Sequence, residues 1–309
     1  MEHRQDGVAR ARFITTLAAV SLNALSVDLE EYFQVSNFEH VINRATWPAL
    51  PSRVVASTRA LLRTFEETES KATFFVLGWV AEREPALVRE IAEHGHEIAC
   101  HGYEHRLVYD IGPERFREDL RRACGAIEDA AGIRPRGFRA PSYSITDRSL
   151  WALDILAEEG FEYDSSIFPV RHHRYGIPDF SRVPVRIQLR GGRSIREFPM
   201  TTLKAGPLKL PLAGGAYLRF FPPFLFRWGF RRLISAGDPI VLYVHPWEID
   251  PRQPRQQVGW KVRVNHYYNL GRTEGRLTRL LREFHFRPLE AVLAELEAGS
   301  RLPAYAFGA

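Results

Sequence analysis

The stretch that decides the fold is Ala72–Cys100, which reads ATFFVLGWVAEREPALVREIAEHGHEIAC. It opens with the short apolar run Ala72–Leu77, which is typical of a strand buried on both faces of a parallel sheet. Residues Pro85–Glu93 then predict a helix, because proline favours the first turn and Gly95 stands just beyond the end. A second strand is predicted at His96–Cys100. This order of strand, helix and strand predicts parallel strands joined by a helix.

The same alternation continues along the chain on both sides of this stretch. Further strands are predicted at Leu25–Asp28, Gly137–Arg139, Phe161–Asp164, Ser194–Pro199 and Pro239–Val244. Further helices are predicted at Ser52–Phe65, at Pro113–Ala131, from Thr146 as N-cap through Glu159, and at Pro222–Ser235. About seven such units within 309 residues predict an α/β fold, a distorted (β/α) barrel of about seven parallel strands.

The chain changes character after residue 250. Residues from Pro251 onward are rich in Arg, Gln and Asn, and they then predict helices at Glu274–Phe284 and Pro288–Ala298. We therefore expect a barrel over residues 1–250 and a C-terminal helical extension over residues 251–309, packed on the barrel.

Composition and charge limit the classes of function. The sequence is 45% hydrophobic and 26% charged, as in a globular protein. Its net charge of +5 comes mainly from scattered arginines, which favour a solvated basic surface over a nucleic-acid stripe and leave an acidic glycan as a candidate partner.

The cysteines and the N-terminal stretch bear on the compartment. Cys100 and Cys124 are the only cysteines, so the sequence has no disulfide framework and no Cys-based zinc motif, and free thiols suit a reducing compartment. The mildly apolar stretch Phe13–Leu25 lacks a small-residue cleavage site, and no apolar run is long enough to span a bilayer. We expect a cytoplasmic protein, with export as the alternative.

Polar side chains interrupt the apolar pattern at the ends of the predicted strands, where a barrel assembles its active site. Asp28, Glu30 and Glu31 close the first strand. Residues two apart in an extended chain share a face, so Asp28 and Glu30 should project together while Glu31 turns away. One carboxylate of such a pair can bind a metal while the other accepts a proton. A solvated helix N-terminus explains these acids equally well.

His101 and His105 follow the strand His96–Cys100. Two histidines at this spacing can bind one divalent ion, and a carboxylate as third ligand leaves a coordination position for water, as in catalytic zinc sites. The competing explanation is two unrelated surface histidines, because the sequence contains 11 histidines.

Three later strand ends carry further candidates. Arg139 could orient a catalytic carboxylate, and the turn that follows it, with Tyr143, could present an N–H to an oxyanion. Taken alone, this motif is better explained as a simple proline turn with a surface arginine. Asp164 by itself resembles a helix cap or a turn residue. His245 ends an apolar strand and is either a hydrogen-bonded structural histidine or a general acid.

Taken together and in this order, these residues resemble the polysaccharide deacetylase family, also called the chitooligosaccharide deacetylase homology domain or carbohydrate esterase family four. The resemblance covers roughly residues 24–250. Its strongest part is GHEIACHGYEH at Gly95–His105, which is close to the family's His-Ser/Thr-x-x-His metal motif. The segments ATFFVLGWVAE, FRAPSYS, YDSS and LYVHPWE resemble other family motifs. The opening DLEEYF and the tail further resemble the exosortase-associated deacetylases of bacterial exopolysaccharide clusters.

The resemblance implies a metal-dependent hydrolase that removes N-acetyl groups from amino sugars of a bacterial polysaccharide. It implies His101 and His105 as ligands of a divalent metal, which we expect to be Zn²⁺. The usual opening of the family has two adjacent aspartates, whereas Leu29 separates the acids here. The same-face argument therefore makes Glu30 the third ligand, with Glu31 as the alternative.

The resemblance also implies catalytic roles. These are Asp28 as general base, Arg139 as its orienting partner, Tyr143 at the oxyanion turn, His245 as the acid that protonates the departing amine, and Asp164 as the residue that holds or tunes His245. The arginine motif carries an extra residue before its tyrosine, so the N–H of Ser142 is an alternative oxyanion donor.

Two other functions remain open from the sequence. A hydrolase of small amides or cyclic imides would share the fold but need a closed pocket, and a degenerate site would leave a non-catalytic glycan-binding protein. Trp79, Trp247 and Trp260 could line an open groove, although aromatic residues more often belong to the core. His266 and its neighbouring tyrosines could cover the site. Every polar role has a candidate residue, which argues against a degenerate site.

Overall fold

The computed structural model describes residues 21–206 and 208–307 of this chain. Its main sheet contains seven neighbouring strands that all run parallel, in the order β10-β1-β2-β3-β4-β5-β7. These strands are β1 (Asn23–Leu29), β2 (Thr73–Val76), β3 (Glu97–Cys100), β4 (Gly137–Phe138), β5 (Tyr163–Asp164), β7 (Ser194–Glu197) and β10 (Ile240–Val244). The predicted α/β class with about seven parallel strands is confirmed.

Two strands that the sequence pattern did not predict extend the sheet beyond β7. Strand β6 (Val185–Gln188) pairs antiparallel with β7, and β11 (Ala304–Tyr305) pairs parallel with β6. The chain end therefore contributes the outermost strand of this sheet.

The gap between β7 and β10 is spanned by a separate hairpin. Within the described residues no strand ladder joins β7 to β10. Strands β8 (Thr202–Ala205) and β9 (Leu208–Pro211) pair antiparallel between them. Thr201 Oγ1 donates to the Val241 carbonyl at 2.9 Å and accepts the Val241 N–H at 2.6 Å. Side-chain and backbone contacts of this segment, and not a continuous ladder, link it to β10.

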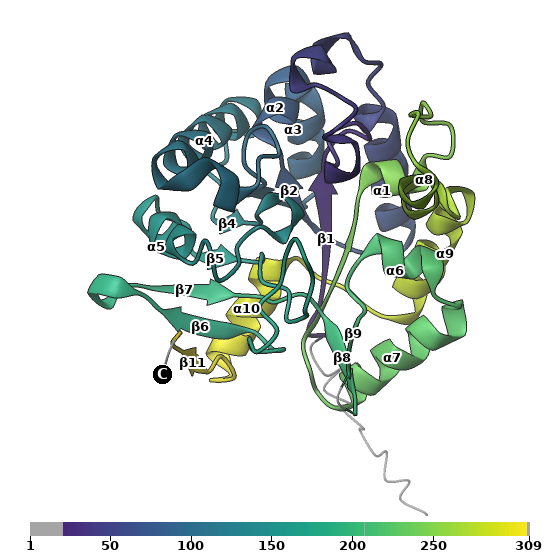
Figure 1. The fold of residues 1–309 in the computed structure, drawn as a ribbon. Coiled ribbons are helices and arrows are strands. Elements are labelled where there is room, and N and C mark those ends of the chain that lie inside the picture. Colours follow the sequence, from purple (N-terminus) through teal and green to yellow (C-terminus); the bar gives the residue numbers. More distant parts are fainter. Residues whose placement is uncertain (1–20, 207, 308–309) are drawn as a thin grey trace, which may run out of the picture.

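Helices surround the barrel-like sheet, and most of them bury apolar faces against its outer face, whereas the last helix packs with Ala24, Phe75 and Val241 on the inner face (Figure 1). They are α1 (Val54–Glu67), α2 (Gly78–Arg83), α3 (Pro85–Glu93), α4 (Val108–Ala131), α5 (Trp151–Glu158), α6 (Gly215–Phe220), α7 (Pro223–Ser235), α8 (Trp260–Tyr267), α9 (Leu270–Glu283) and α10 (Leu289–Ala298). Short 3₁₀ helices occur at η1 (Ser36–Phe38), η2 (Arg44–Ala49), η3 (Pro141–Tyr143), η4 (Arg190–Gly192) and η5 (Pro246–Ile249).

Helix α4 carries the apolar stripe that its sequence predicted. The buried members of the stripe are Phe116, Leu120, Cys124 and Ile127. The element runs from Val108, but its continuous part begins at Pro113 as predicted, because Gly112 adopts a non-helical φ of 76° and ψ of 173° and separates a preceding helical turn from it. A residue with a Cβ rarely takes such a φ, so glycine makes this kink accessible.

The predicted N-cap at Thr146 is wrong. Helix α5 begins at Trp151, with Leu150 in the cap position. The Thr146 carbonyl accepts the Ser149 N–H at 2.8 Å, which closes a turn ahead of the helix. The polar residues of this segment therefore form a local turn in place of the helix start.

The segments after residue 250 pack against the sheet and its first helix. Helix α9 contacts α1 and α6, and α10 contacts β1. The Arg287 backbone donates to the Asn23 carbonyl at 2.9 Å and accepts the Leu25 N–H at 3.0 Å. The Leu289 N–H donates to Thr73 Oγ1 at 2.7 Å. These contacts lie at the amino ends of β1 and β2, on the side of the sheet away from the polar strand ends.

Three features bear on the compartment. The stretch Phe13–Leu25 lies only partly within the described residues, which begin at residue 21, and β1 starts at Asn23. Among the helices that the structure describes, none combines the length and the apolar character of a membrane span. Cys100 and Cys124 are both buried, and their thiols are free.

Candidate active site and metal centre

A pocket of about 570 Å³ opens at the carboxyl ends of the parallel strands. Side chains from the ends of four strands, β1, β3, β4 and β10, line it: Asp28, Glu30, His101, His105, Ser142, Tyr143 and His245. Because the strands run parallel, these ends meet at one edge of the sheet. The structure thereby brings together most of the polar residues that the sequence placed at strand ends.

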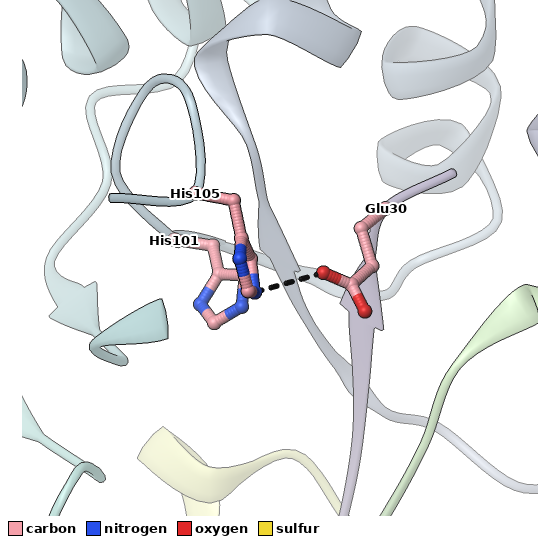
Figure 2. A group of neighbouring side chains, drawn as sticks. All are labelled: Glu30, His101 and His105. Atoms are coloured by element: carbon pink, nitrogen blue, oxygen red, sulfur yellow. Dashed lines mark ion pairs between the residues drawn. The ribbon is translucent and has the colours of Figure 1, made fainter. Parts of the chain in front are cut away.

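Glu30, His101 and His105 converge from the ends of two strands, and their polar atoms point toward one another (Figure 2). One ligand atom from each residue lies within 4.8 Å of the others, and all three side chains are buried. His105 Nε2 is 3.0 Å from Glu30 Oε2. Glu31 turns away, and both its carboxylate oxygens accept the Arg53 N–H at 3.0 Å, at the start of α1. Glu30, and not Glu31, therefore faces the two histidines.

The protonation states of this cluster suit a bound cation. Burial raises the pKa of Glu30, but the imidazoles of His105 and His245 outweigh burial and lower the pKa to about 2. Burial lowers the pKa of His101 to about 4. His101 Nδ1 donates to the Arg139 carbonyl at 2.7 Å, so the proton resides on Nδ1 and Nε2 can bind a metal.

The donor set itself also fits a divalent cation. Glu30 Oε2 is buried and, apart from the His105 imidazole, has no hydrogen-bond partner. A buried carboxylate oxygen without a donor is costly unless it meets a positive charge. Two imidazoles and one carboxylate are the usual protein ligands of a catalytic zinc ion.

Arg139 fixes Asp28 at the wall of the pocket. The arginine is fully buried, and its Nη1 donates to Asp28 Oδ1 at 2.7 Å. Its remaining donors reach Ser26 Oγ at 2.8 Å and the carbonyl and hydroxyl of Ser165, both at 3.0 Å. The guanidinium carbon also lies 4.1 Å from the ring centroid of Phe75. With its donors directed at β1 and at the residue that follows β5, Arg139 holds the Asp28 carboxylate in one orientation.

His245 faces the same carboxylates from the end of β10. Its Nε2 is 3.4 Å from Glu30 Oε1 and 3.8 Å from Asp28 Oδ2. Its Nδ1 is 3.1 Å from Glu248 Oε2. Burial lowers the pKa of His245, but Glu248, Glu30 and Asp28 outweigh burial and raise the pKa to about 9. The surrounding carboxylates therefore favour the protonated imidazolium.

The expectation that Asp164 holds His245 is wrong. Asp164 ends β5, which is not a neighbour of β10 in the sheet. Its carboxylate accepts the Ser166 hydroxyl at 2.5 Å and the Ser166 N–H at 3.2 Å. Burial and the nearby Asp164 raise the pKa of Glu197, so Asp164 belongs to a buried carboxyl pair. Glu248 takes the position at His245, because the η5 turn brings it back toward the end of β10.

The turn after β4 has a strained backbone. Ser142 and Tyr143 adopt φ values of 52° and 57°, which residues other than glycine seldom take. Ser142 Oγ lies 2.5 Å from Ser36 Oγ, which ties the turn to η1. The Tyr143 N–H already donates to the Ala140 carbonyl at 3.0 Å. The Ser142 N–H is therefore the better candidate for an oxyanion donor.

Two residues of the site, Glu248 and Arg219, had no role predicted from the sequence, and Trp247 was expected only to line a groove. Trp247 Nε1 donates to Glu30 Oε1 at 3.2 Å, and Arg219 Nε donates to Glu248 Oε1 at 3.0 Å. Trp247 and Glu248 belong to the segment LYVHPWE, where the spacing of three residues places Glu248 within reach of His245. Arg219 gave no local signal, because it stands alone among aromatic residues of α6 and the loop that follows it.

The aromatic residues expected around the site have different positions. Trp247 lines the pocket, whereas Trp79 packs against Trp47 with ring centroids 5.6 Å apart. Trp260 is exposed at the start of α8 and is not part of the pocket lining. His266 is fully buried and stacks on Trp247 at 4.2 Å, so it supports the pocket wall and does not cover the opening.

Two protein-family models match adjoining parts of this chain. Residues 46–163 match the model described as polysaccharide deacetylase. Residues 165–294 match a model described as a domain of unknown function, DUF3473. The first match contains His101, His105 and Arg139, and the second contains His245 and Glu248.

Curated relatives are similar over about a third of this chain. The chain is 35% identical over 97 residues to the peptidoglycan deacetylase-like protein FGM2 of Gibberella zeae. The aligned segment covers 31% of this chain and 28% of that protein. It is 32% identical over 98 residues to a peptidoglycan-N-acetylglucosamine deacetylase of Bacillus cereus. This alignment covers 31% of this chain and 36% of that protein. The matched segment therefore spans only about a third of either relative.

A solved structure is similar over most of the chain. A crystal structure from Mycobacterium smegmatis, provisionally described as a polysaccharide deacetylase, matches with a TM-score of 0.60 at 21% identity. The match covers 91% of each chain. At this identity the similarity concerns the fold, and it agrees with the α/β architecture found here.

Proposed function

Because this chain belongs to the polysaccharide deacetylase family, we propose that it is a metal-dependent hydrolase of N-acetyl groups on the amino sugars of a polysaccharide. The reaction cleaves the linear amide C–N bond and releases acetate. The observation that carries the proposal is the convergence of Glu30, His101 and His105 beside Asp28 and His245. For the substrate we propose a bacterial exopolysaccharide, on the resemblance of the segment DLEEYF and of the tail.

Glu30, His101 and His105 would hold the metal. We propose Zn²⁺, because two imidazoles and one carboxylate suit a catalytic zinc site that keeps a position open. Such an ion supplies electrophilic activation of the acetamide carbonyl and lowers the pKa of water to about 7. The Arg139 carbonyl orients His101, and the Trp247 indole orients Glu30.

Asp28 serves as the general base that takes the proton from the attacking water. Its carboxylate lines the pocket and is held at 2.7 Å by Arg139. A base that is fixed in this way needs no reorientation when the proton moves.

His245 serves as the general acid that protonates the departing nitrogen. Glu248 holds its Nδ1 at 3.1 Å, which directs Nε2 toward Asp28 and Glu30 in the pocket. The N–H of Ser142 stabilises the developing oxyanion from the strained turn. Base and acid thus act from the ends of neighbouring strands, β1 and β10.

The proposal is tested by metal analysis combined with acetate release from partly deacetylated chitin oligomers. The wild-type protein should carry about one divalent ion per chain, and H101A and H105A should lose metal and activity together. The variant H94A removes an exposed histidine and should keep both. Activity that survives in metal-free H101A would contradict the ligand assignment.

The same preparation separates the alternative functions. Turnover of cyclic imides without acetate release from the oligomers would indicate that the substrate is a small amide or imide and not a glycan. If the metal-loaded protein binds the oligomers but does not turn them over, it is a non-catalytic glycan-binding protein.

A further inference from the structure

The segment between β7 and η5 has an unusual distribution of charge. Residues 198–247 contain a single acidic residue, Asp238. The basic residues in the same segment are Lys204, Lys209, Arg219, Arg227, Arg231 and Arg232. Apart from Arg219, which is buried in the active site, these cations belong to the β8–β9 hairpin and to α7.

Helix α7 carries large apolar side chains on its outer face as well as on its inner face. The inner face buries Phe226 and Phe230 in the core. On the outer face, Phe224 is 74% exposed, Trp228 is 51% exposed and Leu225 is 39% exposed. These three positions lie on one side of the helix at spacings of one, three and four residues. Large exposed aromatic residues grouped on one helix mark an interaction surface.

The aromatic surface borders a basic groove. The β8–β9 hairpin lies beside α7 (Figure 1), and residues of both elements line the groove there, among them Leu203, Lys204, Trp228, Arg231 and Arg232. Arg182, which precedes β6, also lines it. Arg182 pairs with Asp238 at 3.2 Å, and Arg231 pairs with Glu283 at 2.6 Å. Glu283 also pairs with Arg227, so one carboxylate serves two arginines.

Two cations of this groove are left without a carboxylate. Within residues 21–206 and 208–307, no ion pair is formed by Lys204 or Arg232. The surface therefore combines exposed aromatic side chains with a net positive charge. This combination is typical of proteins that bind the surface of anionic membranes, where aromatic residues enter the headgroup region and cations meet the phosphates.

We propose that the outer face of α7, together with the β8–β9 hairpin, binds the surface of an anionic lipid bilayer. Phe224, Leu225 and Trp228 enter the boundary between headgroups and acyl chains, and Lys204 and Arg232 contact lipid phosphates. The surface is connected to the active-site pocket through Phe220, which precedes α7 and lines that pocket. The proposal does not depend on the reaction, because none of these five contact residues lines the active-site pocket.

The test is co-sedimentation of the full chain with lipid vesicles. Vesicles of phosphatidylcholine are compared with vesicles that also contain phosphatidylglycerol, at low and at high salt. The wild-type chain should bind the anionic vesicles, and its binding should weaken as salt screens the charges. The variant F224S/W228S should bind at least about tenfold more weakly, because it loses two apolar side chains that enter the bilayer. The variant K204Q/R232Q should also bind about tenfold or more weakly, since each cation contributes about fivefold.

Matched controls change the same residue types elsewhere on the surface. W260S removes an exposed tryptophan of α8, and R63Q removes an exposed arginine of α1. Both should bind like the wild type. The proposal is overturned by equal binding to neutral and anionic vesicles, or by losses in the controls that match those in the double variants. It is also overturned if the chain forms a dimer in size-exclusion chromatography that F224S/W228S abolishes, because a second copy would then occupy this face.

Discussion

Replacement of Arg139 by methionine tests how strongly the buried pair with Asp28 organises the site. Methionine keeps much of the side-chain volume but removes the charge and all the donors. The buried Asp28 carboxylate then loses its cation at 2.7 Å, and the Ser165 carbonyl loses its donor at 3.0 Å. Removal of one partner from a buried ion pair costs about 3–5 kcal/mol, so we expect R139M to lower the free energy of unfolding by about 4 kcal/mol.

A double-mutant cycle separates the pair from general damage to the core. The variant D28N leaves the Arg139 cation buried without a charged partner and should also be destabilised. The double variant D28N/R139M leaves neither charge, so its loss should fall short of the sum of the single losses by about 2 kcal/mol or more. The free energy of unfolding is measured by urea denaturation of metal-free protein, so that metal binding does not add to the stability.

An exposed arginine pair provides the matched control. Arg59 donates to Glu90 through two nitrogens at 2.8–3.1 Å, but half of the Arg59 side chain is exposed. We expect R59M to change the free energy of unfolding by only about 0–1 kcal/mol. If the losses of D28N and R139M simply add, or if R139M costs no more than R59M, the buried pair does not hold the site in the way inferred here.

Three further predictions follow from individual contacts. Burial, with Lys71 close by, lowers the pKa of His96 to about 4 from about 6.5 when unfolded. Because the unfolded chain binds a proton at His96 that the folded protein does not, the free energy of unfolding should fall by about 2–3 kcal/mol as pH falls from 6.5 to 4. Urea denaturation at several pH values should show a smaller fall for H96N. An equal loss in H96N would exclude His96 as the cause. Asp119 accepts the Tyr103 N–H at 2.8 Å in the histidine loop, so D119A should weaken zinc binding about tenfold or more in calorimetric titration, and D119N less. Unchanged zinc affinity in D119A would contradict this support role. The variant E248Q should lower kcat by about 10²-fold with little change in KM, because it removes the charge that holds the general acid; a wild-type kcat would dismiss that role.

Much of the fold could be predicted from the sequence because the relevant signals are local. The apolar runs and the helix ends at Gly95 and Pro85 gave the order of strands and helices, which the sheet confirms. The alternation of side chains along an extended strand placed Asp28 and Glu30 on one face, and the structure finds both in the pocket. The strands β6 and β11 escaped prediction, β11 because it is the outermost strand and has only two residues.

The partners of the site residues could not be predicted in the same way. The indole of Trp247 reaches Glu30 across 217 positions of the chain, and Arg139 reaches Asp28 across 111. The choice of Glu248 over Asp164 as the partner of His245 follows from the order of the strands and from the η5 turn. An aspartate carries the same carboxylate whether it holds a histidine or forms a buried pair with another carboxyl group, so the residue type of Asp164 did not identify its hydrogen-bond partner.

The sequence by itself therefore determined the α/β class, the strand ends that carry polar residues, and the shared face of the first strand on which Asp28 and Glu30 lie. These features depend on the geometry of a few consecutive residues. Only the tertiary structure decided that Glu30 meets His101 and His105, that Glu248 holds His245, and that aromatic residues of α7 remain exposed. Those outcomes depend on how segments far apart in the chain pack together, and the directions of their hydrogen bonds exist only once that packing has formed.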